Sequence, residues 1–174
     1  YLAYSSLVFS YGIYLSKYDS NGISLWENPI NIVEGSFEDC LVKAVIPNSS
    51  NNGVIVIYES ASFMGVGLNM ISVSSDGQTL SESSLCDDCE NPQFESYAIG
   101  DNEIVVTYKT TSNSLGAAVN AQVLSFDGQI LGSSNGIIVS DEINDQRSSD
   151  ITYSSALDEY FACWNDGRDT FQND

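Results

Sequence analysis

The sequence predicts an all-β protein built from repeats of about 50 residues, and three observations lead to that prediction. A glycine turn recurs along the chain, and the residues before each turn alternate between two faces, as in a half-buried strand. A strand rich in β-branched residues recurs in phase with the turns. No segment has helical spacing, and the 43% apolar content of the 174 residues is typical of a folded protein.

Each repeat contains a segment that we predict to form a strand, a tight turn and a second strand. The recurring turn dipeptides are Asn21-Gly22, Asp76-Gly77 and Asp127-Gly128. Such pairs suit a type I′ turn because both central residues of that turn need a positive φ angle. We therefore expect three type I′ hairpins in equivalent positions.

A second kind of strand carries an aromatic residue at a constant phase of the repeat. The continuous β-branched runs at 54–57 and 104–107 predict central strands that are covered on both faces. We expect the recurring aromatic residues to pack in a core or between neighbouring sheets. The strands are Val54–Ser60, Ile104–Thr110 and Tyr160–Asp166, and the aromatic residues are Tyr4, Tyr58, Tyr108 and Trp164.

Further short segments complete about four strands per period. The periods run over 4–57, 58–107 and 108–163, with the start of a fourth at 164–174, in a single β-repeat region that covers 1–174. A unit of this size cannot bury both of its faces alone, so we expect the units to stack. Because the chain begins and ends at the same phase, we expect a fragment of a longer ring or array. The added strands are Leu41–Ile46, Gln93–Ile99, Asp150–Ala156, Pro29–Val33 and Gly136–Ser140.

A strand that ends in Trp-x-Asp, as at Trp164 and Asp166, is followed by a short acidic loop, a strand like that at Ile13-Tyr14 or Ala121-Gln122, and a glycine turn. This order resembles the long β-propeller-like repeats of microbial and protist cell-surface proteins, and the resemblance covers nearly the whole chain. That resemblance implies β-propeller-type repeats of four-stranded antiparallel blades. Tyr stands where Trp is usual in all periods but the last. A β-trefoil, which also has three repeats of about four strands, is the alternative fold. The matching pieces are Trp164, Asp166, Arg168, Asp169, Ile13-Tyr14, Ala121-Gln122 and the three glycine turns.

The charge balance argues against several classes of partner. Five basic and 24 acidic side chains give a net charge of −19, which repels nucleic acid phosphates and anionic lipid headgroups. No apolar run approaches the roughly 20 residues that span a bilayer, so we expect no membrane insertion.

The cysteines predict a disulfide in a loop and an exported protein. We expect either a Cys86–Cys89 bond or a bond from one of them to Cys40, and we expect Cys163 to be a buried small apolar residue. A zinc site is disfavoured because the chain has no His. A sequon at Asn48 predicts a glycan there.

Two acidic loops are candidates for calcium, the one cofactor that the sequence suggests, because hard cations take carboxylate oxygens. Neither loop has the spacing of an EF-hand, and solvated loop acids are the favoured interpretation. The candidates are Asp87, Asp88 and Glu90 in one loop and Asp141, Glu142 and Asp145 in the other.

The sequence favours a non-catalytic protein. Without His, a Ser-His-Asp triad and most catalytic zinc sites are excluded. We expect an extracellular or cell-surface structural or adhesive module, in a surface or fibrous assembly, whose partners are further blades of its own chain or copies of itself. The alternative is a glycan-binding propeller, or a fragment of a carbohydrate-active enzyme, with Tyr11, Tyr14 and Tyr18 available to stack on sugars.

Overall fold

The computed structural model describes residues 2–6, 12–34, 39–62, 65–112, 116–141 and 146–167. All regular structure in these residues is β, and all neighbouring strands pair antiparallel, which confirms the predicted all-β class. The strands form four separate sheets, and the described strands do not close into a barrel or a propeller. The chain divides into two compact units, Tyr1–Ser84 and Leu85–Asp174.

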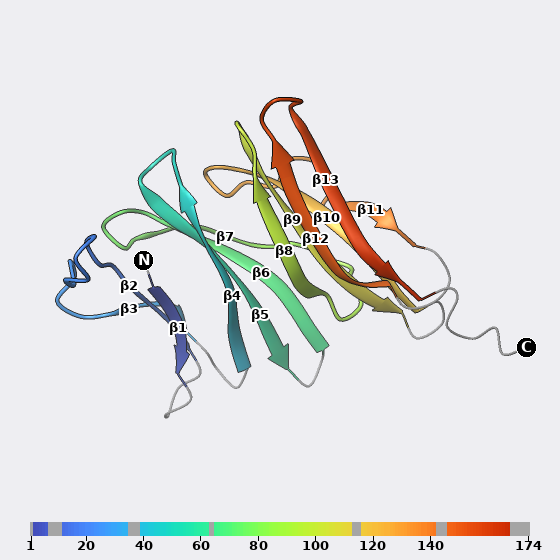
Figure 1. Cartoon of the computed structure of the whole chain (residues 1–174). Helices are drawn as coiled ribbons and strands as arrows, with labels where there is room; N and C mark the ends of the chain where they lie inside the picture. Colours follow the sequence, from blue (N-terminus) through green and yellow to red (C-terminus); the bar gives the residue numbers. More distant parts are fainter. Residues whose placement is uncertain are drawn as a thin grey trace, which may run out of the picture. The chain divides into compact units, whose positions relative to one another are not determined.

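The first unit contains two antiparallel sheets in which strands follow one another in chain order (Figure 1). The smaller sheet consists of β1 (Leu2–Ser6), β2 (Gly12–Ser16) and β3 (Ile30–Glu34). The larger sheet consists of β4 (Asp39–Asn48), β5 (Gly53–Ser62), β6 (Gly65–Val73) and β7 (Thr79–Ser84).

The core of the first unit lies between these two sheets. Val54, Val56 and Tyr58 alternate along β5 and therefore share one face of the strand. They belong to the same buried cluster as Ile13 and Leu15 of β2. Both residues of β2 are fully buried, and the β-branched run at 54–57 of β5 is buried on both faces, as predicted for a central strand.

The second unit repeats this plan with a four-stranded sheet and a hairpin. The sheet consists of β8 (Gln93–Ile99), β9 (Glu103–Ser112), β10 (Gly116–Ser125) and β11 (Ile137–Ser140). The hairpin consists of β12 (Gln146–Ser154) and β13 (Glu159–Asp166), and β12 lies against β8, β9 and β10 (Figure 1).

The core of the second unit is small. Val105 of β9 and Ala121 of β10 pack with Ile151 of β12. The rings of Tyr153 and Tyr160 extend this cluster, with their centres 5.0 Å apart.

A bulge occurs at a similar place in three of the four described sheets. In the pairing of β4 with β5 the register shifts between Val42 and Ala44. Equivalent shifts occur in the first strands of the next two sheets, at Phe94/Ser96 and Arg147/Asp150. A bulge bends its strand and increases the local twist, so the pairing of the first two strands has the same irregularity in all three sheets.

The predicted type I′ geometry of the three turns is wrong. Gly22, Gly77 and Gly128 have positive φ angles of 78°, 90° and 81°, but the Asn or Asp before each of them (Asn21, Asp76 and Asp127) has a negative φ. In the second turn the Gly77 amide donates to the Ser74 carbonyl (3.1 Å), and the Ser74 amide donates to the Gln78 carbonyl (2.9 Å). This pattern is a type I turn followed by a glycine in the left-handed region, which makes a three-residue loop.

The side chain that begins each turn explains this geometry. The Ser74 carbonyl already accepts from the Gly77 amide, so the Gln78 amide needs another acceptor. The Ser74 hydroxyl accepts from the Gln78 amide at 3.0 Å. Ser125 does the same for Gln129 (3.0 Å), and the Asp19 carboxylate does it for Ile23 (2.8 Å). A Ser or Asp three positions before the glycine is therefore the sequence feature that indicates this turn type. The Asn-Gly or Asp-Gly dipeptide alone does not indicate it.

The strand that we predicted directly after each turn forms fully in one repeat only. β7 follows the Gly77 turn and pairs with β6. After the other two turns the chain makes a single bridge, Tyr18 to Ser24 and Leu124 to Ile130, and the outer strand follows later as β3 or β11.

Two predictions about β13 are also wrong. Trp164 is 37% exposed, although we expected it to pack in a core or between neighbouring sheets, and Cys163 is exposed, although we expected it to be buried. β13 pairs only with β12 among the described strands, so one of its edges has no neighbour there. Tyr58 and Tyr108, at the same phase of the repeat, are buried as predicted.

Candidate functional site

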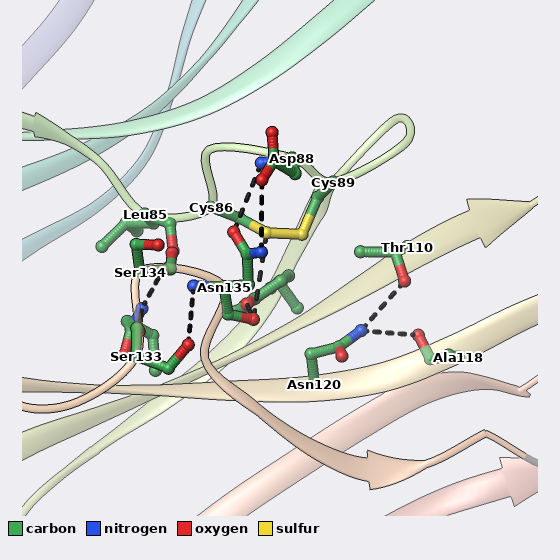
Figure 2. Close-up of a disulfide and its surroundings, with 12 residues drawn as sticks. Leu85, Cys86, Asp88, Cys89, Thr110, Ala118, Asn120, Ser133, Ser134 and Asn135 are labelled. Atoms are coloured by element: carbon green, nitrogen blue, oxygen red, sulfur yellow. Dashed lines mark hydrogen bonds between the residues drawn. A yellow bond between two sulfur atoms is a disulfide. The ribbon is translucent and has the colours of Figure 1, made fainter.

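A hollow of about 320 Å³ in the second unit lies beside a disulfide, and we call it the disulfide hollow. Loop residues Asp88 and Glu90 form one side, and Thr110 and Asn120 come from the neighbouring strands β9 and β10. The turn before β11 forms another side and includes Asn135. Figure 2 shows Asp88, Thr110, Asn120 and Asn135 together with the sulfur bridge.

The disulfide joins Cys86 and Cys89, which is the first of the two predicted pairings. Their Cα atoms are 5.6 Å apart, within the usual range for a disulfide. The bridge closes a short loop, and the Thr111 amide donates to the Glu90 carbonyl (3.0 Å), which ties this loop to β9. Cys40 was the alternative partner and is a thiol.

Gln122 holds the two sides of the disulfide hollow together. This side chain is 1% exposed, and its Nε2 donates to the carbonyl of Leu85 (3.2 Å) and to that of Ser133 (3.0 Å). Leu85 directly precedes the disulfide loop, and Ser133 belongs to the turn before β11. One buried amide therefore fixes both of these segments. This role of Gln122 could not be predicted from the sequence, because a glutamine in a strand gives no sign of its partners.

The turn before β11 is fixed by Tyr108 and Asn135. The Tyr108 hydroxyl donates to the Asn135 carbonyl (3.0 Å). The Asn135 side chain accepts from the Asp88 amide (3.3 Å) and donates to the Asp88 carboxylate (3.5 Å) (Figure 2). Gly136 follows with φ of 72°, and a Cβ there would meet the Tyr108 hydroxyl, so the turn requires glycine.

Asn120 lines the disulfide hollow and is 6% exposed. Its Nδ2 donates to the Thr110 hydroxyl (2.9 Å) and to the Ala118 carbonyl (3.4 Å), as Figure 2 shows. Its Oδ1 accepts no hydrogen bond from the residues that the structure describes. The lining therefore includes carboxylate, hydroxyl and amide oxygens beside apolar side chains such as Ile138.

Burial raises the pKa of Tyr108 to about 12. The phenol therefore stays protonated up to strongly alkaline pH and keeps donating to Asn135. The geometry of the disulfide hollow does not change with pH through this group in the physiological range.

A second hollow of about 170 Å³ in this unit lies between the β8–β9 turn and the β12–β13 hairpin. The Tyr153 hydroxyl donates to Asp158 (2.8 Å), and this bond, with burial and nearby carboxylates, raises the pKa of Tyr153 to about 12. Burial first, and then the charges of Glu103 and other acids, raises the pKa of Tyr160. The Tyr160 hydroxyl donates to the Glu103 carbonyl (3.4 Å), which ties the hairpin to the turn, and a Cβ at Gly100 would collide with that hydroxyl.

The acids predicted to hold calcium do not gather into a site in the part of the chain that the structure describes. No three acidic or thiol side chains lie close enough there to hold a metal ion. Asp87, Asp88, Glu90 and Asp141 are exposed. Glu142 and Asp145 lie outside the described residues.

The structure argues against the predicted glycan at Asn48. This side chain is 2% exposed, and its Nδ2 donates to the Ser72 hydroxyl (3.4 Å). Its Oδ1 accepts from the Ser50 amide (3.0 Å) and the Ser50 hydroxyl (2.7 Å). Asn and Ser at this spacing therefore stabilise the β4–β5 turn, and a glycan on the buried nitrogen would disrupt it.

The structure describes two of the three tyrosines proposed for sugar stacking. Tyr11 lies outside the described residues, Tyr14 is half-buried in β2, and Tyr18 is 42% exposed after that strand. Neither Tyr14 nor Tyr18 lines either hollow.

Comparison with known proteins finds no matching protein family, no similar curated protein and no similar solved structure. In the described residues there is no helix of the length and hydropathy that crossing a membrane requires. The arguments for function therefore rest on the geometry of the two units.

Proposed function

We propose that this chain is a non-catalytic, structural or adhesive β-repeat module of the extracellular space or cell surface, which assembles with copies of itself. The open edge of β13 is the observation that carries this proposal. β13 is the third member of a set of equivalent strands, with β5 and β9 as the other two. Both of those strands have neighbours on both edges, β4 and β6 for β5 and β8 and β10 for β9.

The side chains of β13 are suited to a neighbour that the described strands do not provide. Phe161 is 50% exposed and Trp164 is 37% exposed, although both are large and apolar. Their counterparts by phase, Val105 and Tyr108 in β9, are buried. An open strand edge with apolar side chains favours the addition of another strand.

The internal repeat identifies the kind of strand that would fit this edge. β6 and β10 pair with the corresponding edges of β5 and β9, and both begin with glycine, Gly65 and Gly116. β2 begins with Gly12 and occupies the same place in the first sheet. Because β2, β6 and β10 are each paired on both edges in their own sheets, a second copy would meet β13 through a strand that has an open edge among the described strands, such as its own β13.

The disulfide and the charge bear on where and how this assembly forms. A Cys86–Cys89 bond suits an oxidising compartment, which supports an extracellular location. The net charge of −19 opposes contact between copies, so salt should strengthen association by screening it.

Analytical ultracentrifugation of the whole chain at rising concentration and salt tests the proposal. We expect reversible association that strengthens with salt and is lost in Phe161→Ser/Trp164→Ser. The matched control is Ile23→Ser/Leu25→Ser, which removes two side chains that are 62% and 54% exposed at the first turn and should leave association intact. A chain that stays monomeric up to millimolar concentration, or one in which both double variants behave alike, would contradict assembly through β13.

A further inference from the structure

We propose that the first glycine turn of one copy of the chain packs on Ile137 of another copy, so that copies associate head to tail. The first glycine turn is the segment 19–22, and Ile137 is the first residue of β11. This inference rests on the proposed function, because it names a second surface for the same self-assembly. The argument comes from an equivalent contact that the chain makes within its first unit.

The second glycine turn, residues 74–77, shows how such a turn packs on an outer strand. Gly77 lies so close to Ile30, the first residue of β3, that a Cβ at position 77 would collide with the Ile30 Cδ1 atom. The same Cβ would lie 3.4 Å from the Trp26 ring. The Lys17 Nζ also donates to the Ser75 carbonyl of this turn (2.9 Å). The absence of a side chain at Gly77 therefore makes room for an isoleucine.

Ile137 has the place in the second unit that Ile30 has in the first. Each is the first residue of its outer strand. Ile30 pairs with Leu15 and Ile137 pairs with Ala121, and these two partners stand at the same phase of the repeat. In both pairings a register shift follows nearby along the strand. The two isoleucines are therefore structural equivalents.

The two isoleucines differ in what covers them. Ile30 is half-buried and packs against the core cluster of the first unit. Ile137 is 58% exposed. An apolar side chain that is exposed at a position covered elsewhere in the repeat indicates a contact surface.

The first glycine turn has the free surface that would cover Ile137. Gly22 has a φ of 78°, close to the 90° of Gly77, and it is exposed. A Cβ at Gly22 would meet nothing within 4 Å in the part of the chain that the structure describes. The Asp19 carboxylate accepts from two amides of this segment (2.9 and 2.8 Å), which holds the turn in shape. Gly128 of the third turn, in contrast, is buried.

The turn and the isoleucine are different surfaces, so this contact is heterologous. Each copy carries one of each, and a row of copies can extend. In the second turn the side chains of Gln78 and Leu80 stay exposed beside the Gly77–Ile30 contact. Their equivalents Ile23 and Leu25 therefore lie outside the proposed contact.

One polar part of the contact within the first unit has no equivalent between copies. Val123 stands in the second unit at the position of Lys17, so no ammonium is available there to bind the turn. The association therefore depends on apolar packing. Salt should strengthen it, because the net charge of −19 keeps copies apart at low ionic strength.

Paramagnetic relaxation in NMR spectra tests the inference. A chain with Ser20→Cys, in a Cys40→Ser/Cys163→Ser background, carries a nitroxide label on the first glycine turn and is mixed with an isotope-labelled chain of the same background. We expect broadening of the Ile137 amide signal in the isotope-labelled copy, and more of it as salt is added. The matched control is a label at Ser75→Cys, in the turn that is already packed within its own copy, which should not broaden this signal.

Two variants of the isotope-labelled chain locate the contact. We expect Ile137→Asp to weaken the association at least about tenfold, because a charge that must lose water replaces an apolar contact. The matched control is Leu80→Asp, which makes a similar change at a side chain that is 52% exposed and should leave the broadening unchanged.

Several outcomes would overturn the inference. These are the absence of broadening at Ile137 up to millimolar concentration, equal broadening from the labels on the two turns, or equal effects of the two Asp variants. Association in the ultracentrifuge that Ile137→Asp does not change, with no broadening at Ile137, would contradict this contact and leave assembly through β13 standing. Broadening at Ile137 with full association in Phe161→Ser/Trp164→Ser would support this contact and contradict assembly through β13.

Discussion

β9 and β13 have the same place in the repeat but different surroundings. Each carries its aromatic residue at the same phase, and each begins after a hairpin turn. Tyr108 of β9 is fully buried, whereas Trp164 of β13 is 37% exposed. Every side chain from Ile104 to Tyr108 is buried, but no side chain of β13 is.

This difference shows that neighbouring strands decide whether the side chains of a strand are buried. The sequence pattern that β9 and β13 share does not decide it. β9 lies between β8 and β10 and has β12 against one face. β13 has one pairing partner among the described strands. The larger apolar area in Trp164 did not bury it, because a strand cannot cover its own second edge.

Truncating the two aromatic residues should give the largest contrast. We expect Tyr108→Ala to lower the free energy of unfolding by about 3–5 kcal/mol, as for other buried aromatic side chains. Trp164→Ala should lower it by about 1 kcal/mol or less, because the side chain is partly exposed. Urea unfolding followed by circular dichroism, at a concentration where the chain is monomeric, measures both. Equal losses would show that β13 is as well covered as β9.

Removing Gln122 should reveal how much the loops beside β9 and β10 depend on one amide. We expect Gln122→Ala to cost about 1–3 kcal/mol, because two carbonyls lose their donor. Hydrogen exchange should speed up in the loop at 86–90 and in the turn at 133–136, while β13 exchanges at its wild-type rate. Unchanged exchange at both segments would refute the role of Gln122 as the link between them.

Alkaline pH should weaken the surroundings of β9 through Tyr108. Its pKa is raised to about 12 in the folded protein and is about 10 in the unfolded chain, so the folded state holds this proton more tightly. The resulting stabilisation is present below pH 10 and is lost as the pH rises from 10 to 12. The stability difference between wild type and Tyr108→Phe should therefore narrow over that range in urea unfolding. A constant difference would indicate an ordinary pKa.

The smallest expected difference between β13 and the other strands is in the reactivity of a cysteine thiol. Cys163 on β13 is exposed, whereas Cys40 on β4 is half-buried. We expect a thiol reagent such as dithiobisnitrobenzoate to modify Cys163 at least about tenfold faster, since reaction depends on access to the sulfur. Cys163→Ser and Cys40→Ser assign the two phases. A slow Cys163 would mean that β13 is covered in solution, which would sharpen the case for assembly.

Much less of the disulfide hollow than of the sheets could be predicted. The Cys-x-x-Cys loop and its acids stood out in the sequence, because cysteines and clustered charges are rare and close together along the chain. Asn120, Gln122 and Asn135 did not, because polar side chains in strands and turns show no pattern that identifies their partners. The sequon at Asn48 predicted a glycan for the same reason, since a sequon gives no information about whether its side chain is buried.

The sequence by itself determined the all-β class, most strand positions and the recurrence of one motif, because alternation, β-branched runs and turn glycines are local properties of the chain. The tertiary structure decided which equivalent strand is central and which is an edge, and which polar atoms meet beside the disulfide. It also decided the turn type, through the side chain of Ser74 and its counterparts. Burial and hydrogen bonding depend on atoms distant in the sequence, so a local pattern specifies strands but not their neighbours.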